Sequence, residues 1–242
     1  MLALVFAFLF AAPALPVTEG DHVLRDFKFA SGETLPELRI HYRTLGRFDG
    51  HNAVLILHGT TGSGSQFLSD AFAGVLFGPG QLLDAQKYFI VLPDGIGHGK
   101  SSKPSDGMHA RFPHYGYADM VEAQYRLLRE KLGVNHLRLL VGTSMGGMHT
   151  WLWGEEHPRF MDALMPLASL PVQIAGRNRI MRKMIMDAIR NDPAWKGGEY
   201  TEQPHQGLVA AMNVLVLMTS APLPWQAQAP TRDAADKLYA EI

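Results

Sequence analysis

A serine flanked by glycines has the setting that best suits nucleophilic chemistry in this sequence. Ser144 stands in GTSMG, which matches the pattern G-x-S-x-G. In that pattern the serine occupies a sharp turn between a strand and a helix, and glycines are required because a Cβ would collide with neighbouring backbone. An apolar run ends at Gly142, and a helical pattern starts at Met145, just before Gly146. This context predicts a nucleophile elbow rather than an ordinary tight turn.

Acyl chemistry at a serine also needs backbone N–H groups directed at the negative charge that develops on the substrate oxygen. The amide of Met145, directly after the serine, is one expected donor. The loop 58–62, HGTTG, follows an earlier apolar run and is rich in glycine. We expect Thr60 to supply the second donor of an oxyanion hole, and a plain solvated turn is the alternative.

The segment 93–104, PDGIGHGKSSKP, raises a competing hypothesis because it follows a predicted strand and contains Gly-Lys-Ser. A phosphate-binding loop requires G-x-x-x-x-G-K-[ST]. Counting back from Gly99 places Asp94 where the first glycine is needed, and the segment continues to Pro104 rather than into a helix. Nucleotide binding is therefore the weaker alternative.

The eleven histidines prompt a search for a metal site. The pattern H-E-x-x-H does not occur, and His149 and His157 are too far apart to lie on adjacent turns of one helix. His98 and His109 fall in predicted loops without clustered carboxylates. We expect core or surface histidines, no metal and no cofactor.

Strand and helix patterns alternate through the first two thirds of the chain. Residues 22–46 predict two strands joined by a turn at Ser31 and Gly32, and residues 117–133 predict an amphipathic helix ended by Gly133. Four apolar runs have the continuous character of buried parallel strands: 53–59, 87–95, 137–142 and 160–169. The pattern predicts an α/β domain with a mostly parallel sheet flanked by helices.

Residues 170–242 change in character and predict a helical cap region. An apolar stripe over 180–189 and the segment 205–218 indicate helices, although residues 214–218, VLVLM, would also suit a strand. Residues 231–242 predict a further helix with Thr231 as its N-cap.

Composition narrows the possible functions and partners. Of the 242 residues, 47% are hydrophobic and 19% charged, as in a globular protein, and the net charge of −1 gives no basis for a nucleic-acid partner. The absence of cysteine excludes disulfides and thiolate chemistry. Oligomeric state cannot be predicted.

The first residues are apolar and lead to the small residues Ala12 and Ala14. They predict a signal peptide over 1–14 and a periplasmic or secreted protein without a stable membrane span, since a span needs about 20 apolar residues. A buried N-terminal segment or a misassigned start is the alternative.

Together these patterns resemble the α/β-hydrolase superfamily and, within it, the homoserine O-acetyltransferase-like group. The likeness covers residues 22–220 and rests on five segments: SGETLPELRIHYRTLG, LFGPGQLLDAQKYFIV, DMVEAQYRLL, GTSMGGMHTWLW and NDPAWKGGEY. The resemblance implies an α/β-hydrolase core over 22–169 followed by the cap.

The segment PDGIGHGKSS departs from the acyltransferases and is more like hydrolytic members. An exported enzyme would also lack an acetyl-CoA donor. The sequence therefore favours hydrolysis of a small ester or similar acyl substrate through an acyl-enzyme on Ser144, with acyl transfer of the homoserine O-acetyltransferase kind as the alternative.

In this fold the catalytic acid and histidine follow late strands, after the serine. The later histidines, His149, His157 and His205, lie on predicted helices, and no acid follows a convincing core strand; the acids considered are Asp162, Asp187, Asp192, Asp233 and Asp236. We expect both triad partners and the last core strands to lie beyond Ile242. A third hypothesis is therefore a catalytically inactive fragment with an unpaired sheet edge.

Overall fold

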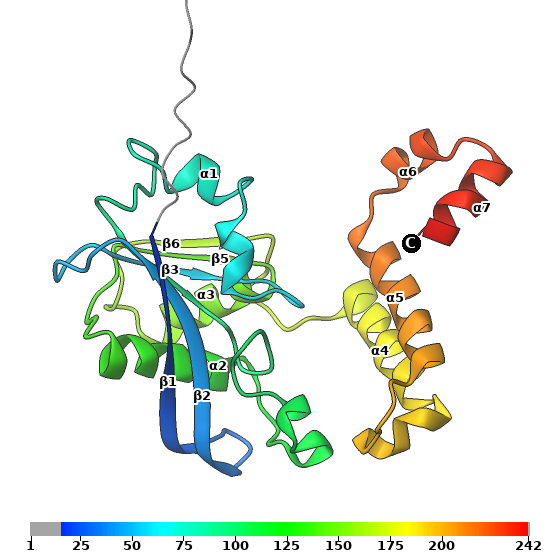
Figure 1. Cartoon of the computed structure of the whole chain (residues 1–242), viewed down its shortest axis with the longest axis horizontal. Coiled ribbons are helices and arrows are strands. Elements are labelled where there is room, and N and C mark those ends of the chain that lie inside the picture. The colour runs from blue at the N-terminus through cyan, green and yellow to red at the C-terminus, as the bar shows by residue number, and fades with distance from the viewer. Residues whose placement is uncertain (1–15, 242) are drawn as a thin grey trace, which may run out of the picture. The chain divides into compact units, whose positions relative to one another are not determined.

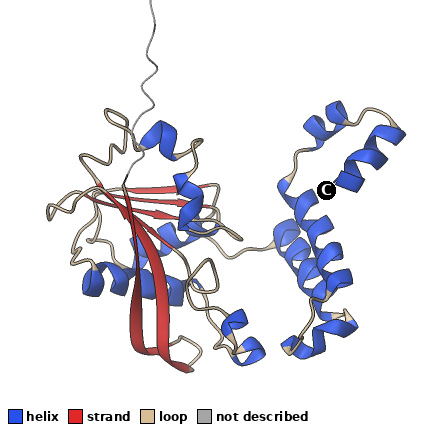
Figure 2. Cartoon of the chain, viewed as in Figure 1, coloured by secondary structure: helices blue, strands red, loops and turns tan. Residues whose placement is uncertain are grey.

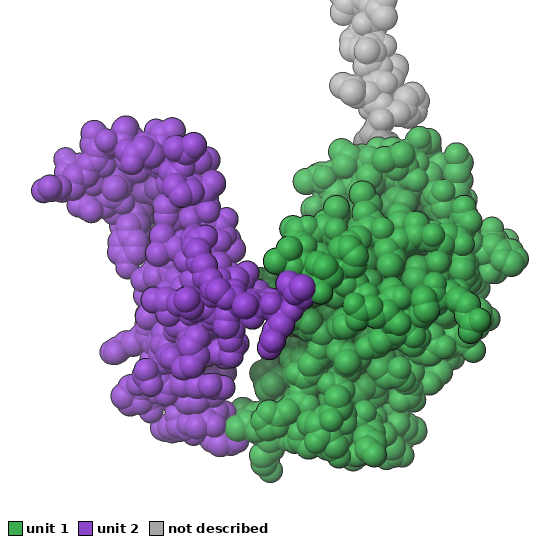
Figure 3. Space-filling model, turned by 180° about the vertical axis from the view of Figure 1, so that it is seen from behind, with its two compact units in different colours: residues 1–171 green, residues 172–242 purple. Residues whose placement is uncertain are grey.

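The structure is a computed structural model that describes residues 16–241. The chain divides into two compact units, Met1–Pro171 and Val172–Ile242 (Figure 3). The predicted signal peptide, residues 1–14, lies outside the described residues.

The first unit is built on a six-stranded mixed sheet with the strand order β1-β2-β4-β3-β5-β6 (Figures 1 and 2). The first two strands form an antiparallel hairpin around Gly32, whose φ of 90° suits the predicted turn. β2 pairs antiparallel with β4, and the other pairs are parallel. The strands are β1 (Val17–Lys28), β2 (Thr34–Leu45), β3 (Ala53–Leu57), β4 (Phe89–Pro93), β5 (Leu139–Thr143) and β6 (Leu164–Leu167).

Helices cover both faces of this sheet. α1 (Ala73–Leu76) lies on one side, and α2 (Tyr117–Arg126) and α3 (Met145–Glu156) lie on the other (Figure 1). Short 3₁₀ turns span Gly64–Leu68, Pro104–Asp106 and His109–Arg111, and a π-helical turn, Leu127–Lys131, extends α2. The α/β architecture predicted from the alternating pattern is confirmed.

Alternate residues of β3 enter different layers of the core, because successive side chains of a strand point to opposite faces. Leu55 packs in the cluster that contains Trp153 of α3. Val54 and Ile56 pack in the cluster that contains Phe77, after α1. All residues of β3 and β4 are buried, as their continuous apolar runs predict.

The strand β6 is less buried than the sequence predicts. The sequence predicts 160–169 as a buried strand, but Leu164, Met165 and Leu167 are 36%, 48% and 38% exposed. Within residues 16–241, β6 is a terminal strand that pairs only with β5. A strand with a neighbour on one side is not enclosed as a central strand is, so its apolar composition alone overestimated its burial.

The second unit is helical. It contains α4 (Gly176–Arg190), a 3₁₀ segment (Pro193–Gly198), α5 (His205–Thr219), α6 (Pro222–Gln228) and α7 (Arg232–Glu241). Residues 214–218 are helical, so the strand alternative for VLVLM is wrong. Thr231 Oγ1 accepts from the N–H of Ala234 at 3.2 Å, which confirms the predicted cap of α7. The sequence did not predict α6.

No single helix among residues 16–241 is long and apolar enough to cross a membrane. α5 and α6 satisfy length and composition only when taken together, and the pair is bent by 104°.

Candidate active site

Ser144 lies between the end of β5 and the first residue of α3, with φ 52° and ψ −110°. This is a positive-φ conformation that side chains rarely adopt and that stores strain of order 1–3 kcal/mol. Two backbone hydrogen bonds hold the turn: Ser144 N–H donates to Leu167 O at 2.9 Å, and Ser144 O accepts from Met148 N–H at 3.0 Å. The serine is therefore held at a sharp bend at the edge where the parallel strands end.

The glycines of the motif allow close backbone packing on both sides of the bend. A Cβ on Gly142 would lie 2.0 Å from the carbonyl oxygen of Gly146. A Cβ on Gly146 would lie 2.2 Å from the carbonyl oxygen of Leu57, at the end of β3. Both distances are far below van der Waals contact, so each position requires glycine. Gly147, which was not singled out from the sequence, is also restricted, because a Cβ there would lie 2.7 Å from the carbonyl oxygen of Leu167.

The loop 58–62 lies beside the serine. β3 and β5 are parallel neighbours with Leu57 opposite Gly142, so their carboxyl ends meet at the same edge. A Cβ built on Gly59 would lie 3.3 Å from Ser144 Cβ. Within the described part of the chain, neither the Met145 nor the Thr60 backbone N–H has a protein acceptor. The geometry is compatible with the predicted oxyanion hole, and the role of these two amides stays a prediction.

His58 is the first residue of this loop, and its sequence context assigned it no role. Its side chain is enclosed, with only 3% of the residue exposed. The imidazole Nδ1–H donates to Gly59 O at 2.8 Å, and Nε2 accepts from Gly95 N–H at 2.9 Å. Burial lowers the pKa of His58, which favours the neutral form that these bonds require. The signal in the sequence was a histidine directly before the glycine of the loop.

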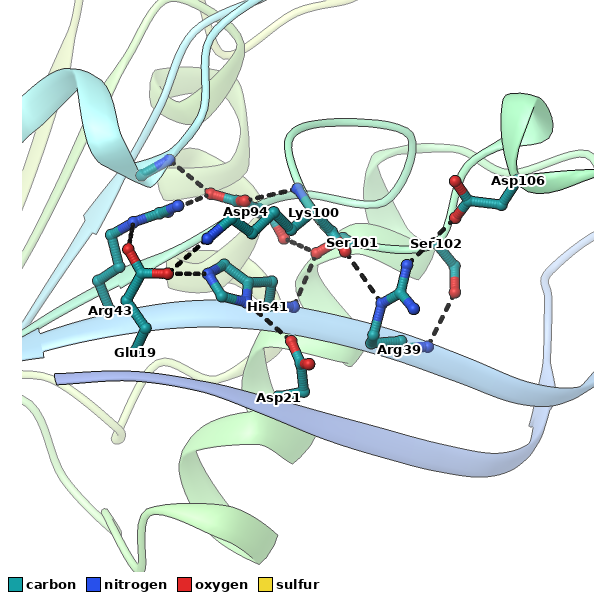
Figure 4. Close-up of polar contacts among 11 residues, drawn as sticks. Glu19, Asp21, Arg39, His41, Arg43, Asp94, Lys100, Ser101, Ser102 and Asp106 are labelled. Carbon is teal, nitrogen blue, oxygen red and sulfur yellow. Dashed lines mark hydrogen bonds and ion pairs between the residues drawn. The ribbon is translucent and has the colours of Figure 1, made fainter.

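The segment that resembles a phosphate-binding loop instead encloses a carboxylate of the protein (Figure 4). Asp94 is fully buried and accepts from Arg43 Nη1 at 2.9 Å, from Gly64 N–H at 2.8 Å and from Lys100 N–H at 2.8 Å. The backbone N–H of Lys100, which in a phosphate-binding loop would face the phosphate, is thus paired with Asp94. This arrangement argues against the nucleotide-binding alternative.

The charges around Asp94 extend to the first hairpin. Glu19 on β1 bonds to Arg43 Nε at 3.0 Å and to Lys100 Nζ at 2.6 Å (Figure 4). The hydrogen bond from Lys100 is the main cause that lowers the pKa of Glu19 to about 2. On β2, His41 Nδ1 lies 2.7 Å from Asp21 Oδ1. The lysine of Gly-Lys-Ser therefore pairs with an acid of the hairpin.

His149 of α3 and His157, the C-cap residue of that helix, serve packing rather than activation of the serine. His149 is 1% exposed, packs edge-on against Tyr117, and accepts at Nδ1 from Gln124 Nε2 at 3.3 Å. Burial lowers its pKa to about 3. His157 stacks on Tyr125 with ring centroids 4.1 Å apart.

Over residues 16–241, no hydrogen bond joins Ser144 Oγ to an imidazole, and no group of three or more His, Asp or Glu side chains could hold a metal ion. The sequence predicts no base or acid for Ser144 within the chain, and the contacts of residues 16–241 add none.

Residues 52–206 match the protein family described as alpha/beta hydrolase fold. The chain belongs to this family, as the sheet order, the elbow and the adjacent glycine loop indicate.

Within the family, the chain is similar to homoserine O-acetyltransferases, which confirms the resemblance found in the sequence. It is 37% identical over 212 residues to the enzyme of that name from Haloarcula marismortui, and the match covers 78% of this chain and 52% of the relative. It is 36% identical over 218 residues to that from Moorella thermoacetica, covering 81% of this chain and 57% of the relative.

Two solved structures show the same fold with different activities in their names. An acetylester hydrolase from Corynebacterium glutamicum aligns with TM-score 0.78 and 26% identity over 88% of this chain and 62% of that chain. A homoserine O-acetyltransferase from Bacillus anthracis aligns with TM-score 0.78 and 25% identity over 88% and 63%. The chain spans a little over half the length of the curated relatives it matches.

Proposed function

We propose that Ser144 is the nucleophile of an acyl-transfer reaction in which a small acyl group, acetyl in the first instance, passes to a hydroxyl acceptor. The observation that carries this proposal is the strained Ser144 turn, with the Gly59–Thr60 peptide beside it. Strain that persists at a non-glycine residue is typical of functional sites.

The proposed chemistry has two steps. Ser144 Oγ attacks the acyl carbonyl carbon and loses its proton, and the carbonyl electrons move onto oxygen, where the N–H groups of Met145 and Thr60 would stabilise the charge. Collapse of this intermediate breaks the bond to the donor, whose thiol or alcohol leaves with the proton lost by Ser144, and an ester remains on Ser144. The acceptor hydroxyl then attacks that ester, the bond to Ser144 Oγ breaks, and the proton of the acceptor hydroxyl passes to Ser144 Oγ.

The identity of the acceptor separates two candidate functions. The sequence favours water, because of the segment 93–104 and the predicted export, and the acetylester hydrolase among the structural neighbours supports hydrolysis. The curated relatives at 36–37% identity are named homoserine O-acetyltransferases, and they support transfer to homoserine more strongly. We therefore place transfer first and hydrolysis second.

The experiment supplies the chain with acetyl-CoA or p-nitrophenyl acetate, each with and without L-homoserine. Mass spectrometry of the Ser144 peptide detects the acetyl-enzyme, and chromatography distinguishes O-acetylhomoserine from free acetate. Ser144→Ala should abolish acylation, and the exposed Ser105→Ala should not. Acetate alone as product would support hydrolysis over transfer.

The inactive-fragment hypothesis has its own test. A serine without a base keeps only a small part of its reactivity, so we compare labelling of this chain and of a homoserine O-acetyltransferase relative by a fluorophosphonate. Labelling of Ser144 at a similar rate would exclude the inactive fragment. Absence of both labelling and acetylation would support it.

We also keep the export of the protein as a proposal, based on the apolar residues before Val17. Expression with periplasmic fractionation and N-terminal sequencing tests it, and an intact Met1 in the cytoplasmic fraction would contradict it.

A further inference from the structure

We propose that His58 is a positioning residue that fixes the direction of the Thr60 N–H, so that this amide faces the carbonyl oxygen of an acyl group bound at Ser144. The inference rests on the proposed function and goes beyond it, because it assigns the geometry of the oxyanion hole to a side chain that does not touch substrate.

The argument begins with the peptide unit between Gly59 and Thr60. A peptide bond is planar and trans, so the carbonyl of one residue and the N–H of the next lie in one plane and point in opposite directions. His58 Nδ1–H donates to Gly59 O at 2.8 Å, and the N–H of Gly62 donates to the same oxygen at 3.1 Å. Two donors on the Gly59 carbonyl therefore set the orientation of the Thr60 N–H.

The imidazole is itself fixed from its other side. Nε2 accepts from the N–H of Gly95, which follows β4, at 2.9 Å. Because Nε2 is an acceptor, the proton of the neutral ring is on Nδ1, where it is needed to bind Gly59 O. The ring thus connects the loop after β3 to the loop after β4 and has a single productive tautomer.

The far end of the same loop is held by the residue before Gly95. Asp94 Oδ1 accepts from Gly64 N–H at 2.8 Å, and the buried pair with Arg43 keeps that carboxylate in place. Residues 58–64 are therefore fastened at both ends to residues 94–95. Between these points Thr60 and Thr61 are exposed, and Thr61 has a φ of 65°. Loss of the His58 bonds would release this exposed part of the loop.

Three titratable groups interact with the His58 imidazole. The ring centroid of His98 lies 5.1 Å away, and Asp94 and His149 interact with His58 electrostatically. His98 disfavours a proton on His58, and Asp94 favours one. Burial has the largest effect and keeps the ring neutral.

The test compares His58→Phe, which removes both hydrogen bonds at similar volume, with His58→Gln, whose amide can donate to Gly59 O. His51→Phe is the matched control, because His51 is exposed and lies before β3. Hydrogen–deuterium exchange of the full chain is measured in peptides covering 58–64 and, as a reference, 17–28. Acetylation of Ser144 by p-nitrophenyl acetate gives kcat and KM.

His58→Phe should raise exchange in 58–64 at least about tenfold while leaving 17–28 unchanged, since only the local loop loses its fastening. It should lower kcat about 10²–10³-fold, the effect of losing one oxyanion donor, with KM within about threefold. His58→Gln should recover part of both properties, and His51→Phe should behave as the unmodified chain.

Unchanged exchange in 58–64 for His58→Phe would overturn the inference, as would a change in KM with constant kcat. If His58→Phe does not fold, the comparison is decided on His58→Gln, which must then show faster exchange in 58–64 and a lower kcat than the unmodified chain and His51→Phe. Absence of Ser144 acetylation in the unmodified chain would count against the proposed function alone, because the exchange measurement decides the orientation of the loop without it.

Discussion

The carbonyl oxygen of Gly146 occupies the space in which a side chain on Gly142 would have to lie, with only 2.0 Å between that oxygen and an added Cβ. Gly142→Ala should therefore lower the free energy of unfolding by at least about 2 kcal/mol, as overpacking against backbone does. Urea unfolding measures the change. Gly74→Ala is the control, because its Cβ would meet nothing closer than 3.8 Å, and it should be neutral or slightly stabilising. Equal effects of both substitutions would contradict the steric role.

At position 144, acetylation requires serine, whereas the stability of the turn should be higher with glycine than with alanine. Ser144→Ala and Ser144→Gly should both abolish acetylation, but glycine tolerates the positive φ at this bend. Relief of strain should make the glycine variant more stable than the alanine variant by about 1 kcal/mol in urea unfolding. A more stable alanine variant would show that the turn is not strained.

His149 should make the stability of the chain depend on pH. Its pKa falls from the usual 6.5 to about 3 in the folded state, so between these values the unfolded chain binds a proton that the folded chain does not. The free energy of unfolding should therefore decrease as the pH is lowered from 6.5, by up to about 1.4 kcal/mol per pH unit. Denaturation at pH 7, 6, 5 and 4 measures the slope. His149→Leu should reduce it, and the exposed His51→Gln should leave it unchanged.

Two acids of the network in Figure 4 should differ in importance because they differ in burial. Asp94→Asn removes the buried one of the two acid partners of Arg43, Glu19 being the other, and should cost about 2–3 kcal/mol. Asp106→Asn disrupts a half-exposed pair with Arg39 and should cost less than about 1 kcal/mol. Thermal and urea unfolding provide the comparison. A small loss in the free energy of unfolding for Asp94→Asn would mean that the three hydrogen bonds of Asp94 do not anchor the loop 58–64.

The exposed edge of β6 should promote self-association. Met165 is 48% exposed on a terminal strand of the described sheet, and a charge on such a strand discourages pairing with another chain. Met165→Lys should lower the apparent mass in sedimentation experiments at high protein concentration. Val75→Lys, on α1 and 61% exposed, should not. If both variants had the same apparent mass, any self-association would not involve β6.

Local patterns were sufficient for most elements of the fold. The continuous apolar runs at β3, β4 and β5 correspond to buried strands, and the turn at Gly32 joins the hairpin as predicted. Two assignments depended on long-range packing: the exposure of β6 depends on how many neighbours it has, and the helical state of 214–218 depends on packing within the second unit. A third element, α6, was missed because its pattern is too short to be detected.

Only part of the candidate site, too, could be predicted from the sequence. The motif around Ser144 was visible because its glycines stand at fixed spacing, and steric exclusion by neighbouring backbone imposes that spacing. The contacts of His58 and Asp94 could not be predicted, because a single histidine or aspartate in a glycine-rich loop has no characteristic spacing. Their partners, Gly95 and Arg43, belong to other segments of the chain.

The sequence by itself determined the elbow, the order of strands and helices along the chain, and the likeness to the acyltransferases, since all of these are set by residue type and local spacing. Only the tertiary structure decided that the loop 58–64 is fastened to residues 94–95 and that the Gly-Lys-Ser segment encloses Asp94 rather than presenting itself to a phosphate. The physical reason is that these hydrogen bonds join the carboxyl ends of neighbouring strands. Sheet pairing brings those ends together, and no local pattern in the chain encodes that proximity.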